Sequence, residues 1–296
     1  MKKLYDLLII GGGPGGYTAA LYAARAGLSV AVLEKLSAGG QMALTDTVDN
    51  YPGFPEGIDG FALGENMQTQ AERFGAVTVL TEVLSVNLSA PEKEVRTDEG
   101  TFWGKTLIIA TGAGPKKLGF EGRNVHYCAA CDGMRYKGKT VVVVGGGNSA
   151  VADALVLSRI AEKVILVHRR DTLRATKVYH EALAEAPNVT FLWNSAVTGL
   201  TEEGVTVKDL LAGEEKEVKA DGLFVSIGRQ PATELVKGQL SLDENGYIIA
   251  GEDTAASLPG VYAVGDVRTK AVRQIVTAVA DGAIAAHMAE TYLAKH

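Results

Sequence analysis

The feature that most constrains the fold is a glycine-rich pattern that occurs twice, each time after a buried, strand-like apolar run and before a helical stretch. The first copy is Gly11-Gly12-Gly13-Pro14-Gly15-Gly16, and the second is Gly145-Gly146-Gly147-Asn148-Ser149-Ala150. They fit G-x-G-x-x-G and G-x-G-x-x-A, the turns at which a helix N-terminus and bare backbone approach a pyrophosphate. The continuous apolar runs are typical of parallel strands buried on both faces. The sequence therefore predicts an α/β protein with two Rossmann-like, three-layer ββα nucleotide-binding domains.

The two copies differ at the residue that ends the second strand. Glu34 follows Gly11 by 23 residues, and His168 follows Gly145 by the same 23. An acid at this position accepts hydrogen bonds from a ribose and disfavours a 2′-phosphate, so the first copy suits FAD or NAD. The second copy has a basic cluster there, which suits the 2′-phosphate of NADPH. Its members are His168, Arg169, Arg170 and Arg174. The alternative is an ordinary solvated run of charges.

The order of the remaining segments indicates that one domain interrupts the other. A buried strand at 106–110 closes in Thr111-Gly112-Ala113-Gly114-Pro115, which is typical of a boundary. Strand-like character resumes over 247–264, and an alanine-rich helical stretch runs from 273 to 293. We expect a split first domain at 1–114 and 244–296, with the second domain inserted at 115–243. Within the first part we expect a helix over 58–75 and a meander of strands over 77–88, 94–97 and 101–103.

Both cysteines of the chain lie in Cys128-Ala129-Ala130-Cys131-Asp132. Two thiols three residues apart can close into a disulfide and reopen with the transfer of two electrons. Half of a zinc site is the alternative, although no second cysteine pair exists to complete four ligands. Asp132 either handles a proton for the cysteines or caps the turn, and we interpret His126 as a structural histidine.

Composition excludes several other classes. The chain has 35 acidic and 29 basic residues, a formal net charge of −6, which argues against a general nucleic-acid binder. No apolar run approaches the roughly 18 residues of a membrane span, and the first residues do not resemble a signal peptide. We therefore expect a cytoplasmic protein with no membrane partner.

Together these motifs resemble the bacterial low-molecular-weight thioredoxin reductases, and the resemblance covers the whole chain. Besides the two glycine turns, the matching segments are Gly39-Gly40-Gln41, Asn50-Tyr51-Pro52-Gly53, 126–132, 168–170 with Arg174, Gly265-Asp266-Val267 and Arg273-Gln274. The resemblance implies a homodimer, an FAD domain formed by both ends of the chain, and an inserted NADPH domain that carries the cysteines and rotates. It also implies electron transfer from NADPH through FAD to the Cys128–Cys131 disulfide and then to thioredoxin or a thioredoxin-like protein. Cys131 would lie nearest the flavin, and Asp132 would manage a proton.

The expected site residues follow from the motifs and the resemblance. Catalysis is expected of Cys128, Cys131 and Asp132, with no metal. The FAD set is Gly11, Gly13, Pro14, Gly15, Gly16, Glu34, Lys35, Gly40, Gln41, Asn50, Thr111, Gly112, Gly265, Asp266, Val267, Arg273, Gln274 and Ile275. The NADPH set is Gly145, Gly147, Asn148, Ser149, Ala150, His168, Arg169, Arg170 and Arg174.

Two residues depart from the family pattern. Ala130 stands where threonine is usual between the cysteines, and Ala280 where glycine is common near the flavin. Alternative functions are a ferredoxin-fed reductase, the flavoprotein of a peroxide-reducing system, a small-molecule dithiol oxidase, and a non-catalytic redox or nucleotide sensor. The arginine cluster counts against a ferredoxin-fed form.

Overall fold

The computed structural model describes residues 3–122 and 124–296, and the chain divides into two compact units. The first unit combines Met1–Gly114 with Gln230–His296, and the second is Pro115–Arg229. The predicted boundary between 114 and 115 coincides with this division. The return to the first unit comes after Arg229, earlier than the predicted boundary after 243. The reason is packing, because Val236 and Leu240 are buried in the same apolar cluster as Leu8 of the first unit.

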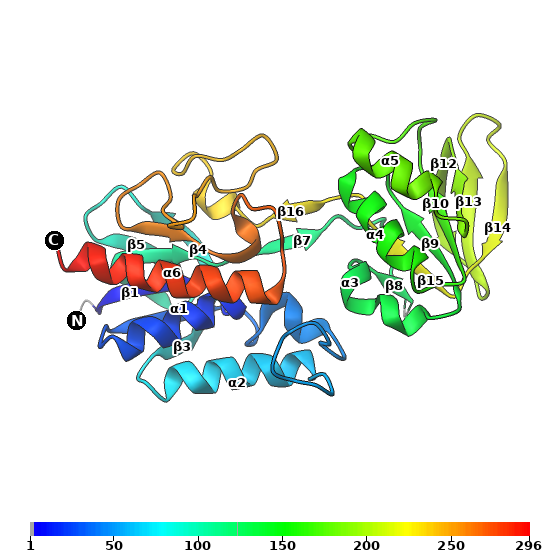
Figure 1. Ribbon diagram of the computed structural model, residues 1–296. Helices are drawn as coiled ribbons and strands as arrows, with labels where there is room; N and C mark the ends of the chain where they lie inside the picture. The colour runs from blue at the N-terminus through cyan, green and yellow to red at the C-terminus, as the bar shows by residue number, and fades with distance from the viewer. Residues whose placement is uncertain (1–2, 123) are drawn as a thin grey trace. The chain divides into compact units, whose positions relative to one another are not determined.

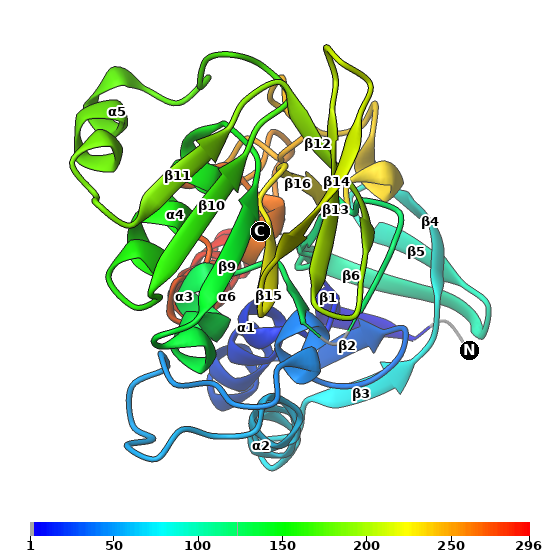
Figure 2. The ribbon, with the colours of Figure 1, turned by 90° about the vertical axis from the view of Figure 1, so that its right-hand side faces the viewer.

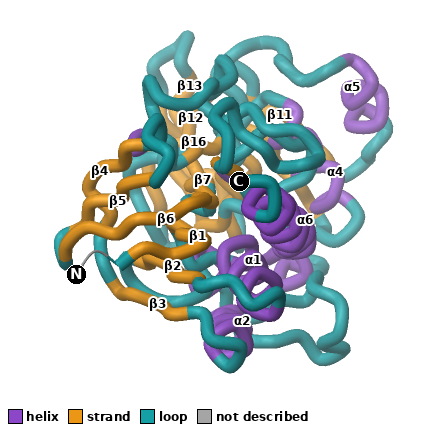
Figure 3. The backbone as a smooth tube through the Cα atoms, turned by 90° about the vertical axis from the view of Figure 1, so that its left-hand side faces the viewer, coloured by secondary structure: helices purple, strands orange, loops and turns teal. Residues whose placement is uncertain are grey.

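A seven-stranded sheet forms the centre of the first unit (Figure 3). In spatial order its strands are β3 (Val77–Leu80), β2 (Val30–Glu34), β1 (Leu4–Ile10), β6 (Gly100–Ile109), β5 (Lys93–Thr97) and β4 (Val83–Asn87), and β17 (Val261–Ala263) also pairs with β6. Strands β4 and β5 are antiparallel to their neighbours, and the other pairs are parallel.

The sheet corrects the predicted meander in two places. The expected strand over 77–88 is two strands, and β3 joins the parallel sheet beside β2 rather than a hairpin. The expected strands at 101–103 and 106–110 are one, β6, which is continuous through Gly104. A Cβ at Gly104 would lie 2.9 Å from Leu8 Cγ, so a glycine lets β6 stay against β1 at this point.

Alternating side chains divide the core of the first unit into two layers. Leu7 and Ile9 of β1 pack under three helices, whereas Leu8 and Ile10 face the opposite side. The helices are α1 (Pro14–Arg25), α2 (Gly60–Glu72) and α6 (Ile275–Leu293), which lie on one face of the sheet (Figures 1 and 3). The other face is covered in part by the segment 234–258, which begins with the 3₁₀ helix η3 (Glu234–Val236). Most of the expected strand over 247–264 is therefore irregular, and only β17 is regular.

The second unit has the predicted three layers (Figure 2). Its central parallel sheet has the order β11 (Val189–Leu192), β10 (Lys163–Val167), β9 (Thr140–Val144), β15 (Gly222–Val225) and β8 (Val125–His126). Val141 and Val143 pack with α3 (Ala129–Asp132), α4 (Asn148–Ser158) and α5 (Lys177–Ala184). Val142 and Val144 pack against the antiparallel sheet β12 (Ser195–Leu200), β13 (Gly204–Asp209) and β14 (Glu215–Lys219). The predicted α/β class is confirmed.

The chain passes between the units twice, and the two crossings pair with each other. Strand β7 (Ala113–Pro115) forms a two-stranded ribbon with β16 (Arg229–Pro231). Gly112 O accepts a hydrogen bond from Ala232 N on one side of this ribbon, and Gly228 O accepts from Lys116 N on the other. Among the described residues, no helix combines the length and apolar character needed to span a bilayer.

Candidate active site

The first glycine turn leaves an open space at the N-terminus of α1. Gly11 has φ +106°, and a Cβ there would lie 2.5 Å from Ala110 O, so only glycine fits. A Cβ on Gly16 would overlap Gly11 O. At Gly13, in contrast, nothing lies within 4 Å of a Cβ, and α1 has no side-chain cap. An open, glycine-walled helix N-terminus fits a pyrophosphate.

Glu34, at the end of β2, lies directly against this turn. Its Oε2 accepts a hydrogen bond from Gly12 N at 2.6 Å, and its Oε1 accepts from Leu36 N at 3.0 Å. The carboxylate therefore lies against the turn at which the sequence predicts the first nucleotide. Lys35 instead pairs with Glu82, with 2.6 Å between Nζ and Oε1.

Other residues of the predicted FAD set are linked to the same turn or to each other. Gly12 O accepts from Gly39 N, which precedes Gly40 and Gln41 in the 3₁₀ helix η1 (Gly40–Leu44). Gln41 donates to Ala113 O at 2.7 Å, next to Thr111 and Gly112. The amide of Asn50 donates to Gln274 Oε1 at 3.1 Å, just before α6.

The remaining members of that set are held differently. The guanidinium of Arg273 lies 4.0 Å from the Tyr247 ring centroid. Ile275 packs against the small cluster of Met42, Val48 and Leu63. Val267 is fully buried in the core, so its side chain is closed to any ligand. Pro14 and Gly15 begin α1, and a Cβ on Gly15 would lie 3.0 Å from Ala278 O of α6.

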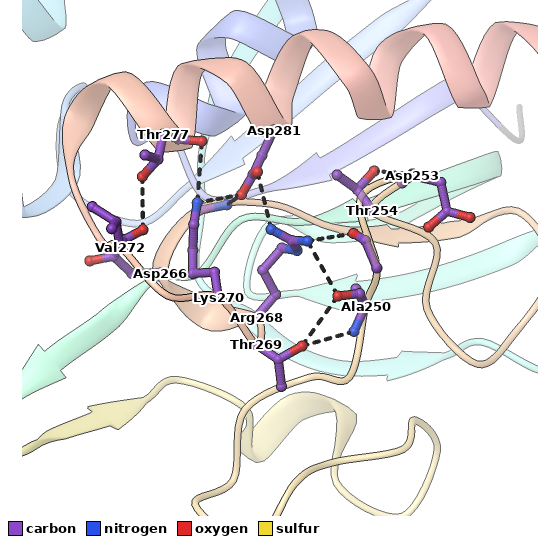
Figure 4. Close-up of polar contacts among 12 residues, drawn as sticks. Ala250, Asp253, Thr254, Asp266, Arg268, Thr269, Lys270, Val272, Thr277 and Asp281 are labelled. Atoms are coloured by element: carbon purple, nitrogen blue, oxygen red, sulfur yellow. Dashed lines mark hydrogen bonds and ion pairs between the residues drawn. The ribbon is translucent and has the colours of Figure 1, made fainter. Parts of the chain in front are cut away.

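A buried charge network supports the Gly265-Asp266-Val267 turn, which is the 3₁₀ helix η4 (Figure 4). Asp281 of α6 accepts from Gly265 N at 2.9 Å, from Arg268 Nη1 at 3.1 Å and from Lys270 Nζ at 2.7 Å. All three charged side chains are no more than 10% exposed. The sequence reasoning missed this network, and the only signal was an acid, Asp281, among the small residues in the middle of an alanine-rich helix.

The second glycine turn is built around His168 rather than an acid. A Cβ on Gly146 would overlap the His168 imidazole, which contacts the Trp193 ring edge to face at 6.4 Å between centroids. Burial lowers the pKa of His168, and the charges of Arg174, Arg169 and Arg170 lower it further. The imidazole is therefore neutral and fills the space beside Gly146, and the three exposed guanidinium groups supply the positive charge.

The loop that carries these arginines is tied to the turn. Gly146 O accepts from the backbone N–H of Arg174 at 2.7 Å and of Ala175 at 3.1 Å. Asn148 Oδ1 accepts from Thr176 N at 2.9 Å, Ser149 is exposed, and Ala150 packs against Gly145. Gly147 is the N-cap of α4, with no side-chain cap, and a Cβ on it would lie 3.9 Å from Arg174 Nη2. The predicted NADPH residues thus lie at one helix N-terminus with cations beside it.

The cysteines form a disulfide across the single-turn helix α3. The Cα atoms of Cys128 and Cys131 are 5.3 Å apart, and Asp132 N donates to Cys128 O at 3.1 Å. Asp132 Oδ2 lies 3.3 Å from His126 Nδ1, and its Oδ1 lies 3.8 Å from Arg135 Nη1. Within residues 3–122 and 124–296, no group of three or more His, Cys, Asp or Glu is arranged to hold a metal.

Asp153 of α4 is a second residue that the sequence reasoning missed. Its carboxylate accepts hydrogen bonds from the Ser226 hydroxyl, after β15, and from the backbone N–H of Ala129, between the cysteines. Burial raises the pKa of Asp153, and these two hydrogen bonds offset part of that rise. The cysteine turn is therefore fastened to the helix that begins at the second glycine turn.

Comparison with known proteins agrees with this arrangement of two glycine turns and a disulfide. Residues 5–282 match the family model of pyridine nucleotide-disulphide oxidoreductases. The chain belongs to this family. Relatives of this oxidoreductase include the thioredoxin reductases of Streptomyces clavuligerus, 45% identical over 99% of this chain and 95% of that protein, and of Bacillus subtilis, 42% identical over 99% and 96%. The crystal structure of thioredoxin reductase from Streptococcus pyogenes covers 100% of both chains with a TM-score of 0.92 and 40% identity.

Proposed function

We propose that this oxidoreductase is an NADPH-dependent thioredoxin-disulfide reductase. The observation that carries the proposal is the Cys128–Cys131 disulfide, held in the same unit as the arginine-flanked glycine turn. Full-length relatives named thioredoxin reductase support it. In this proposal the acceptor is a thioredoxin or a thioredoxin-like protein, and the protein acts as a homodimer. Location in the cytoplasm stays a prediction.

FAD is assigned to the first unit and NADPH to the second. The open space at Gly13, with Glu34 at its edge, fits an adenine dinucleotide without a 2′-phosphate. The guanidinium groups of Arg169, Arg170 and Arg174 fit a 2′-phosphate, because arginine binds phosphate with a planar fork of donors. When bound, the two cofactors supply the electrons that open the disulfide.

The residues of this chain then perform the thiol chemistry. One thiolate of the reduced pair attacks a sulfur of the thioredoxin disulfide and forms a mixed disulfide. The second cysteine attacks the first, which releases reduced thioredoxin and restores the Cys128–Cys131 bond. Asp132, one residue from Cys131, is the group that gives a proton to the departing thiolate.

The test is turnover of NADPH with the host's own thioredoxin. Wild-type protein should be yellow and should reduce thioredoxin, and the Cys128→Ser and Cys131→Ser variants should keep their flavin and lose thioredoxin reduction. A colourless protein, from which denaturation releases no flavin, would overturn the proposal. A Cys131→Ser variant with wild-type turnover would contradict the proposed path of the electrons.

A further inference from the structure

Three side chains in series connect the cysteine turn to a polar cavity at the opposite end of the central sheet's strands. Asp132 Oδ2 lies 3.3 Å from His126 Nδ1, and His126 Nε2 lies 2.7 Å from the Tyr136 hydroxyl. Tyr136, in the 3₁₀ helix η2 (Gly133–Tyr136), also lines a cavity of about 510 Å³, together with Arg135, Lys139 and Asp221. Both nitrogens of one imidazole are thus engaged, one toward the acid beside Cys131 and one toward the cavity wall.

Packing fixes the imidazole in this bridging position. His126 is 7% exposed, and its ring contacts those of Tyr136 and Phe224 at centroid distances of 5.3 and 5.2 Å. Gly222 makes room for Tyr136, because a Cβ on this glycine would overlap the phenol ring. A histidine held only by apolar packing would not need a polar partner at each ring nitrogen. The structure therefore gives His126 more than the structural role that the sequence suggested.

The chemistry of these groups suits the transfer of a proton. A neutral imidazole donates from one nitrogen and accepts at the other, so it can take a proton on one side and release one on the other. Burial raises the pKa of Tyr136, so its phenol keeps a proton through the neutral range. The ionisable groups that face this series are Asp132, Arg135, Lys139 and Asp221.

We infer that Tyr136 and His126 form a proton relay that returns protons from cavity water to Asp132. This inference rests on the proposed function. NADPH supplies a hydride equivalent, so conversion of the Cys128–Cys131 disulfide into two thiols needs one further proton, which Asp132 gives up. His126 passes its Nδ1 proton to the Asp132 carboxylate and takes the Tyr136 proton at Nε2. Tyr136 recovers a proton from water, so the net change moves one proton from water to Asp132.

The test compares Tyr136→Phe with Tyr127→Phe. The first change removes the hydroxyl of the relay and keeps the ring. The second removes the buried hydroxyl of Tyr127, the residue before Cys128. This hydroxyl has no hydrogen-bond partner in the described parts of the chain. Reduction of the disulfide by dithiothreitol is followed by alkylation and mass spectrometry from pH 6 to 9, with rates corrected for the dithiothreitol thiolate. Since relayed protons matter most when free protons are scarce, Tyr136→Phe should match wild type at pH 6 and be about tenfold slower at pH 9.

Two further measurements keep the result interpretable. His126→Gln should reproduce the pH-dependent loss, and Tyr127→Phe should follow wild type at every pH. If Tyr136→Phe slowed disulfide reduction by the same factor at every pH, or did not slow it at all, the relay would be overturned and His126 would be a packing residue. The dithiothreitol assay needs neither NADPH nor thioredoxin. If Tyr136→Phe shows the expected pH-dependent loss with dithiothreitol, yet the wild-type protein fails to reduce thioredoxin with NADPH, the proposed function is refuted and the relay is not.

Discussion

In the proposed function, single residues decide which nucleotide each glycine turn accepts. The middle glycine of each turn faces the side chain that ends the second strand, Gly12 under Glu34 and Gly146 under His168. The acid accepts a hydrogen bond from the turn itself, whereas the neutral imidazole packs against the turn and forms a hydrogen bond with the Thr172 backbone. In the proposed function, charge selectivity in the second unit therefore comes from Arg169, Arg170 and Arg174, not from the residue that replaces the acid.

Replacement of Arg169 and Arg170 together by glutamine should erode the preference for NADPH. Each lost charge-assisted hydrogen bond is worth about 1.5–3 kcal/mol, so kcat/KM for NADPH should fall at least roughly 10-fold while that for NADH changes little. Arg159→Gln, at an exposed arginine at the end of α4, is the control and should leave the ratio as it is. An unchanged NADPH/NADH ratio in the double variant would reject the phosphate assignment.

Asp281 should be essential for the stability of the first unit. The Asp281→Asn change removes the negative charge that the buried Arg268 and Lys270 share, and the loss of one partner from a buried ion pair typically costs about 3–5 kcal/mol. Glu94→Gln, which breaks the exposed pair with Arg96, should cost less than about 1 kcal/mol. Urea unfolding can be followed through Trp103 in a Trp193→Phe background, because the chain has two tryptophans, one in each unit. Equal midpoints for both variants would contradict this account.

At the scale of elements, the contact between α1 and α6 joins the two ends of the chain. A Cβ on Gly282 of α6 would overlap Gly15 O and lie 2.9 Å from Ala19 N, both backbone atoms of α1. The helix that follows the first glycine turn and the last helix thus approach at backbone distance. This approach also brings η4 and the start of α6 to the candidate FAD site.

The Gly282→Ala change should therefore weaken the fold, and Gly13→Ala should not. Overpacking of rigid backbone costs about 1–3 kcal/mol, so Gly282→Ala should lower the melting temperature of the cofactor-free protein. Gly13 has φ −76° and open space around its Cα, so alanine fits there without strain. Its methyl group would instead stand in the proposed pyrophosphate space, and flavin affinity should fall. Normal flavin binding by Gly13→Ala would argue against that assignment.

Elements that depend on short-range sequence patterns could be predicted, and elements that depend on long-range contacts could not. The glycine turns, the strands before them and the acid or base that ends the second strand could be read from the sequence because each lies within about 25 residues. β3 has the composition of a hairpin strand, and only long-range pairing with β2 places it in the parallel sheet. The segment 247–264 is ordered by side-chain contacts such as the hydrogen bond from Arg268 to Ala250 O. The hydrophobic periodicity of the sequence does not reveal contacts of this kind. His126 and Tyr136, ten residues apart, meet only because of the turn that the cysteines form.

At the scale of the whole molecule, each apolar cluster belongs to one unit. The clusters around Val141–Leu166 and Val142–Val225 contain only residues of the second unit, and the others contain only residues of the first. Because the two crossings pair in the β7–β16 ribbon, the ends of the inserted segment lie next to each other. Such an insertion can be removed or replaced with little effect on either core.

A fragment of residues 115–229 should therefore fold alone. It should show a single cooperative thermal transition and bind 2′,5′-ADP more tightly than 5′-AMP, because the arginines and the glycine turn come with it. Isothermal titration calorimetry measures both affinities, and the same fragment with Arg169→Gln and Arg170→Gln is the control. A fragment without a cooperative transition would show that its core depends on the first unit.

The split of the first unit also sets an order of events during protein synthesis. Ile109 of β6 pairs with Ala263 of β17, so this edge of the sheet stays bare while 154 more residues are made. At roughly 5–20 residues per second the ribosome needs about 8–30 s for that stretch. The inserted unit, which is continuous, can fold in the meantime, while the half-built sheet exposes an edge that invites aggregation. The nascent chain should thus depend on chaperones most strongly between emergence of β6 and completion of α6.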